Sequence, residues 1–346
     1  VSMVNDGNKI VTNSYNMKER NTNIEILRLI LMIAIFGWHI LVHGYDYKNV
    51  ESMQCLGGYN LLTFCFLSSL LAPATYCFMF ISGFYGLNFS VKKALNLELW
   101  LIMTCLIVYL LKFMLDFHFH FGMRGLLTCF IPISSSKWWF MTNYVLVMIM
   151  SPIINKGFGL VNKKTVSIIL TLLIVYQYLS FVKLIPSGGS NFLSLLTMYL
   201  IGRYCSIYNI NINRNKSILL FVLLWILQFS FMLLCGHFIQ KILFRTLNYN
   251  TPFIMMMSIS LFYIFKGMVP KYSKRINYCC QSVLFVYLFT ENLGPDLYRA
   301  IRYIIDDSVG MGISVSFLTI VGCLIVGRLI MWLSNRLLQS TIYRYI

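Results

Sequence analysis

Residues 23–43 combine the length of a membrane-spanning helix with side chains that supply acid–base chemistry and a fixed positive charge. Four ionisable residues, Glu25, Arg28, His39 and His43, interrupt this mostly apolar stretch. On an α-helix, with about 100° between successive residues, all four fall within one broad stripe. Ionisable groups inside a span are costly and usually face a bundle interior or a watery cavity. The stretch therefore predicts a functional helix whose polar face points away from lipid.

His39 and Arg28 are the two residues of this helix that we most expect to have a functional role. A histidine titrates near neutral pH and can act as a general base toward a hydroxyl group. The two residues lie about 16 Å apart along a helix axis, at a rise of about 1.5 Å per residue, so they mark two depths of one site. Both residues also have a structural explanation. Arg28 could extend to the lipid headgroups, aided by Glu25, and His39 could simply form a hydrogen bond with a backbone carbonyl or a neighbouring helix. For His43 we expect a position at the membrane interface.

The composition indicates a polytopic integral membrane protein. Hydrophobic residues make up 58% of the 346 residues and charged residues only 11%, whereas about 25% are charged in an average soluble protein. The polar residues that precede the first span contain no signal-peptide core, so we expect this span to be retained. The net charge of +17 is distributed from loop to loop. It therefore indicates membrane topology and a lipid bilayer as partner, and not nucleic-acid binding.

Apolar runs joined by short polar segments predict an all-α fold, with about ten transmembrane helices in one bundle. The predicted spans are 24–43, 60–87, 97–116, 138–155, 165–183, 191–208, 217–237, 251–267, 281–302 and 311–335. Lys and Arg are about twice as frequent in the set of alternate loops that includes both termini, which predicts cytoplasmic termini. Residues 1–23 are then a cytoplasmic segment, 24–335 the transmembrane domain and 336–346 a cytoplasmic tail. Arg28 is expected in the cytoplasmic half of its helix and His39 in the outer half.

The first predicted span resembles the first-helix motif of the acyltransferase 3 family. The resemblance lies in Ile24-Glu25, in Arg28, and in His39 after ten intervening residues. This family comprises membrane acyltransferases that modify bacterial surface glycans. Three further segments are similar to motifs of the family, namely Ile81-Ser82-Gly83-Phe84, Trp139-Phe140-x-x-x-Tyr144 and Ser151-Pro152. The number of predicted spans is also similar, and the resemblance extends over most of the chain.

The resemblance implies transfer of an acyl group, usually acetyl, from cytoplasmic acyl-CoA to a hydroxyl of a cell-surface or lipid-linked polysaccharide. The enzyme would lie in a bacterial plasma membrane, with His39 as the catalytic base and Arg28 as a contact of the CoA phosphates. Lys92 and Lys93 stand where many relatives carry paired arginines, so they are candidate CoA contacts that lack the bidentate fork. Glu25, Trp139 and Tyr144 are expected to support the site. Acetyl-CoA or another acyl-CoA is the implied donor, and no metal is predicted.

Glu291 is a second candidate catalytic residue, although Thr290 occupies the place where relatives often carry a histidine. A carboxylate near the middle of a span is expensive without a partner. Glu291 could orient His39, pair with Arg328 or stay protonated, and the sequence leaves these alternatives open. Gly294-Pro295 just beyond it should break or kink the helix, because proline cannot continue the hydrogen-bond ladder.

Other polar residues carry weaker hypotheses. Lys112 and Asp116, four residues apart, are expected to form a local pair. A metal site at His118 and His120 would need further ligands that the sequence does not identify. Cys55 could pair with a second cysteine, Cys129, on the outer side. A glycan exporter or flippase that uses Glu291, Arg328 and the kink at Pro295 is the alternative function, followed by a structural subunit of an envelope-synthesis complex.

Overall fold

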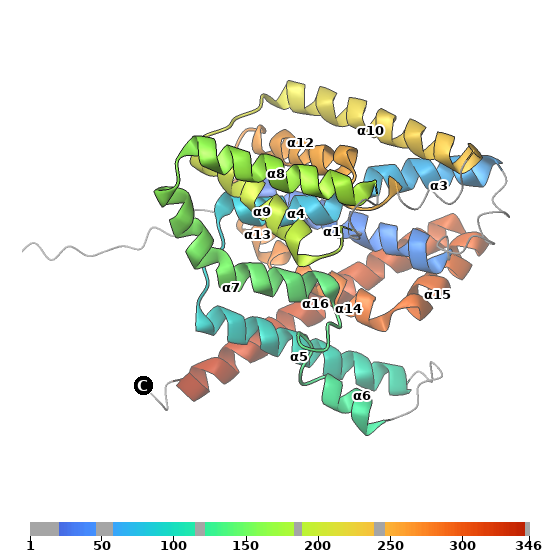
Figure 1. Cartoon of the computed structure of the whole chain (residues 1–346). Helices are drawn as coiled ribbons and strands as arrows, with labels where there is room; N and C mark the ends of the chain where they lie inside the picture. The colour runs from blue at the N-terminus through green and yellow to red at the C-terminus, as the bar shows by residue number, and fades with distance from the viewer. Residues whose placement is uncertain (1–20, 46–57, 115–121, 183–188, 239–245, 343–346) are drawn as a thin grey trace, which may run out of the picture.

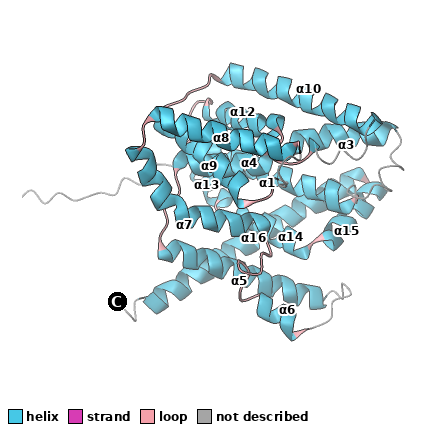
Figure 2. Ribbon diagram, in the orientation of Figure 1, coloured by secondary structure: helices cyan, strands magenta, loops and turns pink. Residues whose placement is uncertain are grey.

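The computed structural model describes residues 21–45, 58–114, 122–182, 189–238 and 246–342, which are helical apart from their connections and contain no strand (Figure 2). In chain order the helices are α1 (Thr22–His39), the π-helix η1 (Ile40–Gly44), α3 (Gly58–Leu71), α4 (Ala74–Tyr85), α5 (Val91–Met114), α6 (Met123–Thr128), α7 (Trp139–Leu160), α8 (Lys163–Phe181), α9 (Phe192–Ile207), α10 (Arg214–Phe238), α12 (Pro252–Lys266), α13 (Lys274–Cys280), α14 (Leu284–Leu293), α15 (Pro295–Asp307) and α16 (Val309–Ile342). Cys55, Asp116, His118 and His120 lie outside the described residues, so the hypotheses about them stay predictions. The all-α prediction is confirmed for the part of the chain that the structure describes.

Five stretches of the described chain are long and apolar enough to cross a membrane. They are Thr22–Gly44, Leu61–Tyr85, Val91–Met114, Arg214–Cys235 and Val309–Leu338. Two shorter helices, α9 and α12, are also apolar. These helices identify the chain as a membrane-embedded protein, because hydrophobic segments of about 20 residues match the thickness of a bilayer core.

Helix α1 occupies the centre of the bundle. It contacts α3, α4, α12, α13 and α14, and Figure 1 shows α10 and α5 at opposite edges with α1 and α4 between them. On one side α10 packs on α3 and α12, while on the other side α5 packs on α14 and α16. A residue on α1 is thus surrounded by protein over much of its circumference, which is where ionisable side chains can be accommodated.

Helices α4 and α9 pack extensively against each other, and this packing explains the Ile81-Ser82-Gly83-Phe84 segment. A methyl group on Gly83 would overlap the backbone of Tyr199, and one on Gly202 would overlap the backbone of Phe80. Glycine at both positions therefore lets the two backbones approach closely, as small residues do between membrane helices. This contact fixes α4, which carries Phe78 and Thr75 toward α1.

The structure corrects the boundaries of three predicted spans. Span 60–87 is divided into α3 and α4 at Pro73, and α5 begins at Val91, so Lys92 and Lys93 lie in its first turn and not in a loop. Span 281–302 is broken into α14 and α15 at Gly294, whose φ of 77° is strained for residues with a side chain. The predicted break at Gly294-Pro295 is confirmed, and α15 buries Tyr298 while it exposes Asp296, Arg299, Asp306 and Asp307.

Candidate active site

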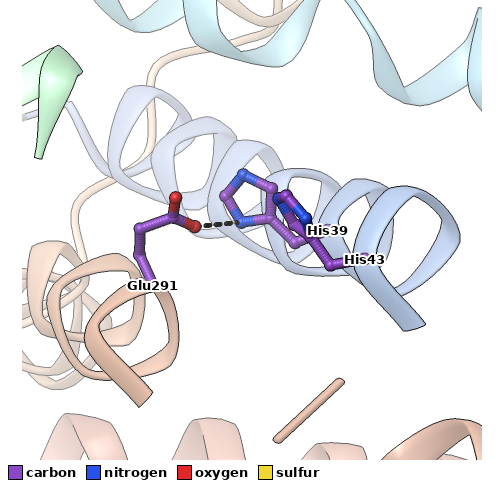
Figure 3. Close-up of side chains that lie close together, drawn as sticks. All are labelled: His39, His43 and Glu291. Carbon is purple, nitrogen blue, oxygen red and sulfur yellow. Dashed lines mark ion pairs between the residues drawn. The ribbon is translucent and has the colours of Figure 1, made fainter. Parts of the chain in front are cut away.

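His39 is the last residue of α1 and is buried, with 8% of its surface exposed. Its Nδ1 atom lies 3.1 Å from Oε2 of Glu291, within ion-pair distance. The same Nδ1 atom lies 3.1 Å from the hydroxyl oxygen of Tyr298. The imidazole is therefore held on one edge by two partners, while its second ring nitrogen points away from Glu291 (Figure 3). Of the three roles that the sequence leaves open for Glu291, the structure favours orientation of His39.

The break between α14 and α15 places these two partners. Glu291 lies in the last turns of α14, and Tyr298 lies in the first turns of α15, beyond the Gly294-Pro295 break. Helix α15 then docks on η1, where a methyl group on Gly44 would come within 2.8 Å of the backbone oxygen of Tyr298. Gly44 thus permits the close approach that puts the Tyr298 hydroxyl beside His39.

His43 lies in the π-helical turn η1 directly after His39. Its ring centroid is 5.5 Å from that of His39, and its ring stacks on Tyr298 at 5.9 Å and 24°. Single π-turns are rare in proteins and occur frequently at functional sites. The structure therefore places His43 beside His39 and Glu291 in one cluster (Figure 3).

Arg28 lines a cavity of about 360 Å³, which we call the Arg28 cavity. Its wall also contains Lys93, Asn96, Trp100, Tyr144 and Gln281. The guanidinium of Arg28 donates a hydrogen bond of 3.0 Å to Glu25, whose side chain is almost fully buried. This pairing holds the guanidinium at the cavity wall, because an unpaired buried carboxylate would be costly.

Two cationic side chains line the Arg28 cavity, Arg28 from α1 and Lys93 from α5, and a third cation, Arg328, lies near it. Both Lys92 and Lys93 are exposed in the first turn of α5, and of the two only Lys93 lines the cavity. Arg328 of α16 donates a hydrogen bond of 2.7 Å to Gln281 of the cavity wall and lies 3.4 Å above the ring of Tyr278. Arg328 is therefore engaged near this cavity and does not pair with Glu291.

A second, smaller cavity of about 60 Å³ lies between the Arg28 cavity and His39, and we call it the central passage. It shares Phe78, Phe140, Val283 and Leu284 with the Arg28 cavity. Apart from His39 and Thr75 its wall is apolar or aromatic. Met32 and Ile35 of α1 line it between Arg28 and His39, so residues of the stripe predicted on this helix line both neighbouring cavities.

A third cavity, of about 560 Å³, opens on the other side of His39 and is called the Glu291 cavity. It shares His39, Trp139 and Tyr249 with the central passage. Its remaining wall is formed by Trp38, Val42, His43, Ser190, Leu247, Asn248 and Glu291. His39 is thus reached from two cavities that lie on opposite sides of it.

Trp139 and Tyr144 of α7 line different cavities. Trp139 lines the central passage and the Glu291 cavity, and its ring stacks on Tyr249 at 5.6 Å and 29°. Burial raises the pKa of Tyr249 to about 12, so its hydroxyl stays protonated at neutral pH. Tyr144 lines the Arg28 cavity and stacks on Phe140. The structure therefore brings both residues to these cavities but does not bring them together.

Sequence reasoning missed Tyr298, Tyr249 and the contribution of His43. Tyr298 and Tyr249 come from segments far from α1 in the chain, and no local motif marks them. Two glycines in the sequence could have indicated the position of Tyr298. Gly294 marks the break before α15, and Gly44 permits the close approach of α15 to η1.

The fold and the site together define a class: a membrane-embedded helical protein with a buried histidine between a cation-lined cavity and a carboxylate-lined cavity. The family model described as an acyltransferase domain matches residues 21–328, a range that includes every residue of this site. The chain therefore belongs to the acyltransferase 3 family and is an acyltransferase. Among curated proteins and solved structures, none matches the chain.

Proposed function

We propose that this acyltransferase moves an acyl group, acetyl in the simplest case, from cytoplasmic acyl-CoA to a hydroxyl of a cell-surface or lipid-linked polysaccharide. The observation that carries the proposal is the position of His39, which closes the central passage on one side and lines the Glu291 cavity on the other. A donor and an acceptor can then approach one imidazole from different sides of the membrane.

The Arg28 cavity suits the CoA part of the donor. Its volume of about 360 Å³ falls within the range of about 300–1,000 Å³ that is usual for ligand sites. Arg28 and Lys93 supply positive charge for phosphates, and arginine binds phosphate oxygens in a bidentate manner. The side-chain oxygen of Asn96 has no hydrogen-bond partner among the described residues, which leaves it as an acceptor for an amide of the ligand.

The central passage suits the acyl-bearing arm. It runs along α1 from the Arg28 cavity to His39, two residues that an α-helical rise separates by about 16 Å. With a volume of about 60 Å³ and a mostly apolar wall, it has room for a slender chain but not for a nucleotide. A thioester at the end of a pantetheine arm would reach His39 by this route while the nucleotide stays in the Arg28 cavity.

The Glu291 cavity suits the acceptor. Trp38, Trp139 and Tyr249 offer ring surfaces, and Asn248 and Ser190 offer hydrogen-bonding groups, which are the features that a sugar with several hydroxyls requires. A hydroxyl of the sugar would approach the edge of His39 that points away from Glu291 (Figure 3). The Tyr298 hydroxyl also contacts Nδ1 and leaves this edge open.

The chemistry assigned to His39 is general base catalysis. Nε2 of the imidazole takes the proton of the acceptor hydroxyl as its oxygen attacks the thioester carbonyl, and the carbon–sulfur bond then breaks. The proton passes from the imidazolium to the departing CoA thiolate, so the transfer is balanced and leaves the enzyme unchanged. Glu291, 3.1 Å from Nδ1, stabilises the imidazolium in between and fixes the tautomer that leaves Nε2 unprotonated.

The proposed orientation puts the Arg28 cavity in the cytoplasmic half of a bacterial plasma membrane. Two structural observations support termini on one side of the bundle. Arg28 near the start of α1 and Lys93 near the start of α5 line the same cavity, and Trp100 of that cavity donates a hydrogen bond of 2.7 Å to Ser334 near the end of α16. With ten crossings and cytoplasmic termini, acyl-CoA would enter from the cytosol, where it is made.

A strain that lacks the gene, complemented with wild-type or His39→Gln protein, tests the proposal. We expect NMR of the surface polysaccharide to show O-acyl groups with the wild-type protein and none with the variant, at equal protein levels in the membrane. Polysaccharide that still reaches the surface without O-acyl groups supports the transferase. Polysaccharide that accumulates inside the deletion strain would contradict it and support an exporter.

A further inference from the structure

We propose that His39, His43 and Glu291 form a binding site for a divalent transition metal of the Zn²⁺ class, and that the bound metal inhibits the enzyme. The three side chains each offer one ligand atom, and these atoms all lie within 4.8 Å of one another. Metal binding is independent of the proposed polysaccharide acylation, whereas the inhibition rests on the role proposed for His39.

The distances suit a tetrahedral ion after a small adjustment. Zinc binds nitrogen at about 2.0–2.1 Å and carboxylate oxygen at about 2.0–2.2 Å, which puts neighbouring ligand atoms about 3.4 Å apart. Nδ1 of His39 and Oε2 of Glu291 are already 3.1 Å apart. The widest separation in the cluster, 4.8 Å, must then close by about 1.4 Å.

His43 can make that adjustment. It is half-buried at the wall of the Glu291 cavity, which has a volume of about 560 Å³, so a rotation of its side chain brings a ring nitrogen closer. His39 and Glu291 are fixed more firmly, on α1 and α14. Closure of the site therefore requires movement of one side chain and no movement of a helix.

The donor set selects the ion. Two imidazoles and one carboxylate with an open fourth position match the ligands of known zinc sites, and imidazole also suits Co²⁺ and Ni²⁺. The Glu291 cavity supplies the open position and room for a water molecule. The Tyr298 hydroxyl now contacts Nδ1 of His39 at 3.1 Å and would give up that contact to the metal, which leaves it close enough to bond the coordinated water.

Metal binding and catalysis compete for the same atoms. A metal ion would take the place of the proton between Nδ1 of His39 and the carboxylate of Glu291. The coordinated imidazole could no longer form the imidazolium that the transfer requires, and the ion would occupy the end of the acceptor cavity. Zn²⁺ from the outer side is thus expected to stop acyl transfer reversibly.

Titration of the purified full chain with Co²⁺ tests the site directly, with the protein in lipid nanodiscs and without a histidine tag. We expect one equivalent of Co²⁺ to produce the visible absorption of a tetrahedral nitrogen–oxygen site, and one equivalent of Zn²⁺ to remove it. His43→Gln should weaken binding at least about 100-fold, because loss of even an outer partner costs about 10- to 100-fold in affinity. Glu291→Gln should weaken it similarly, which covers the case in which one variant fails to fold.

The other histidine pair of the chain provides the matched control. The double substitution His118→Gln/His120→Gln removes the same number of imidazoles as the proposed site contains and should leave Co²⁺ binding unchanged. Absence of the tetrahedral absorption in the wild-type protein, or its loss in the control and not in His43→Gln, would overturn the site.

Inhibition is measured as CoA release from acetyl-CoA in the presence of the surface polysaccharide as acceptor, with and without Zn²⁺, relative to the metal-free rate of each variant. We expect saturating Zn²⁺ to suppress wild-type release at least about tenfold and EDTA to restore it, while His43→Gln requires at least about 100-fold more Zn²⁺. Unchanged or increased release at saturating Zn²⁺ would overturn the inhibitory role. If metal-free protein releases no CoA, the proposed function fails, and the Co²⁺ titration still decides the metal site.

Discussion

The Arg28 cavity and the Glu291 cavity are both lined in part by the first helix, at different positions along it, yet they differ in chemistry. The Arg28 cavity presents cations and amides, with Arg28, Lys93, Asn96 and Gln281 on its wall. The Glu291 cavity presents imidazoles, a carboxylate and aromatic rings. The difference supports the proposed division of tasks, in which the Arg28 cavity would bind a phosphate-bearing donor and the Glu291 cavity would hold the acceptor beside the proposed base. The central passage joins them and keeps their charged groups apart.

Removal of the proposed base should have the largest effect. His39→Gln keeps a polar side chain that cannot take up a proton, so we expect acyl transfer to fall by about 10²–10⁴-fold. Donor binding in the Arg28 cavity should be nearly unchanged, since the substituted side chain would lie at the far end of the passage. Transfer and equilibrium binding of acetyl-CoA, measured on the same purified preparation, check both parts. Equal losses in the two measurements would contradict the division of tasks.

Blocking the central passage should separate the two cavities. Ile35→Trp fills a passage of about 60 Å³, and we expect transfer to drop about 10²-fold, because misplacement of a reacting group by about 1 Å already costs this much. Binding of CoA without an acyl group should persist. Ile33→Trp is the matched control, since Ile33 is 46% exposed on the opposite face of the same helix. A similar loss in both variants would show that the path does not run past Ile35.

Weakening the cationic cavity should raise the KM for the donor with little change in kcat. Arg28→Lys keeps a charge beside the buried Glu25 but loses the bidentate fork, so we expect the KM to rise about tenfold, the equivalent of about 1.4 kcal/mol. Lys93→Ala should also raise the KM, whereas Lys92→Ala should change it less because Lys92 does not line the cavity. Steady-state kinetics at varied acetyl-CoA concentration measure these effects, and equal effects of the two lysines would argue against the Arg28 cavity as the donor site.

Removal of the Tyr298 hydroxyl should have the smallest effect, confined to kcat. A neutral hydrogen bond contributes about 0.5–1.5 kcal/mol, so Tyr298→Phe should lower kcat by about 2- to 10-fold. Tyr287→Phe is the control, because the buried Tyr287 hydroxyl has no hydrogen-bond partner among the described residues although its ring lies 6.3 Å from that of His39. A larger loss from Tyr287→Phe than from Tyr298→Phe would show that Tyr298 does not position the imidazole.

The sequence was sufficient to predict features that depend on local pattern. Hydropathy and helical periodicity predict α1 and the stripe that joins Arg28 to His39, and the missing amide of Pro295 predicts the break after α14. The same reasoning places Lys92 and Lys93 in a loop, although the structure continues α5 through them. Boundaries are set by packing at helix ends, which a composition window does not register.

The contacts that complete the site depend on packing between distant segments. Tyr298 meets His39 only because Gly294 ends one helix and Gly44 lets the next approach η1. Arg328 bonds Gln281 and not Glu291, a choice between partners that hydropathy cannot resolve. A single sequence thus predicts which residues could act in catalysis or binding, whereas the structure shows which of their side chains lie in contact.

The most direct test of the division of tasks is a cryo-electron-microscopy structure of the His39→Gln protein in nanodiscs with acetyl-CoA. We expect density for the CoA nucleotide in the Arg28 cavity, near Arg28 and Lys93, with the acyl arm in the central passage ending beside position 39. Nucleotide density in the Glu291 cavity, or an acyl arm that does not enter the passage, would contradict the account.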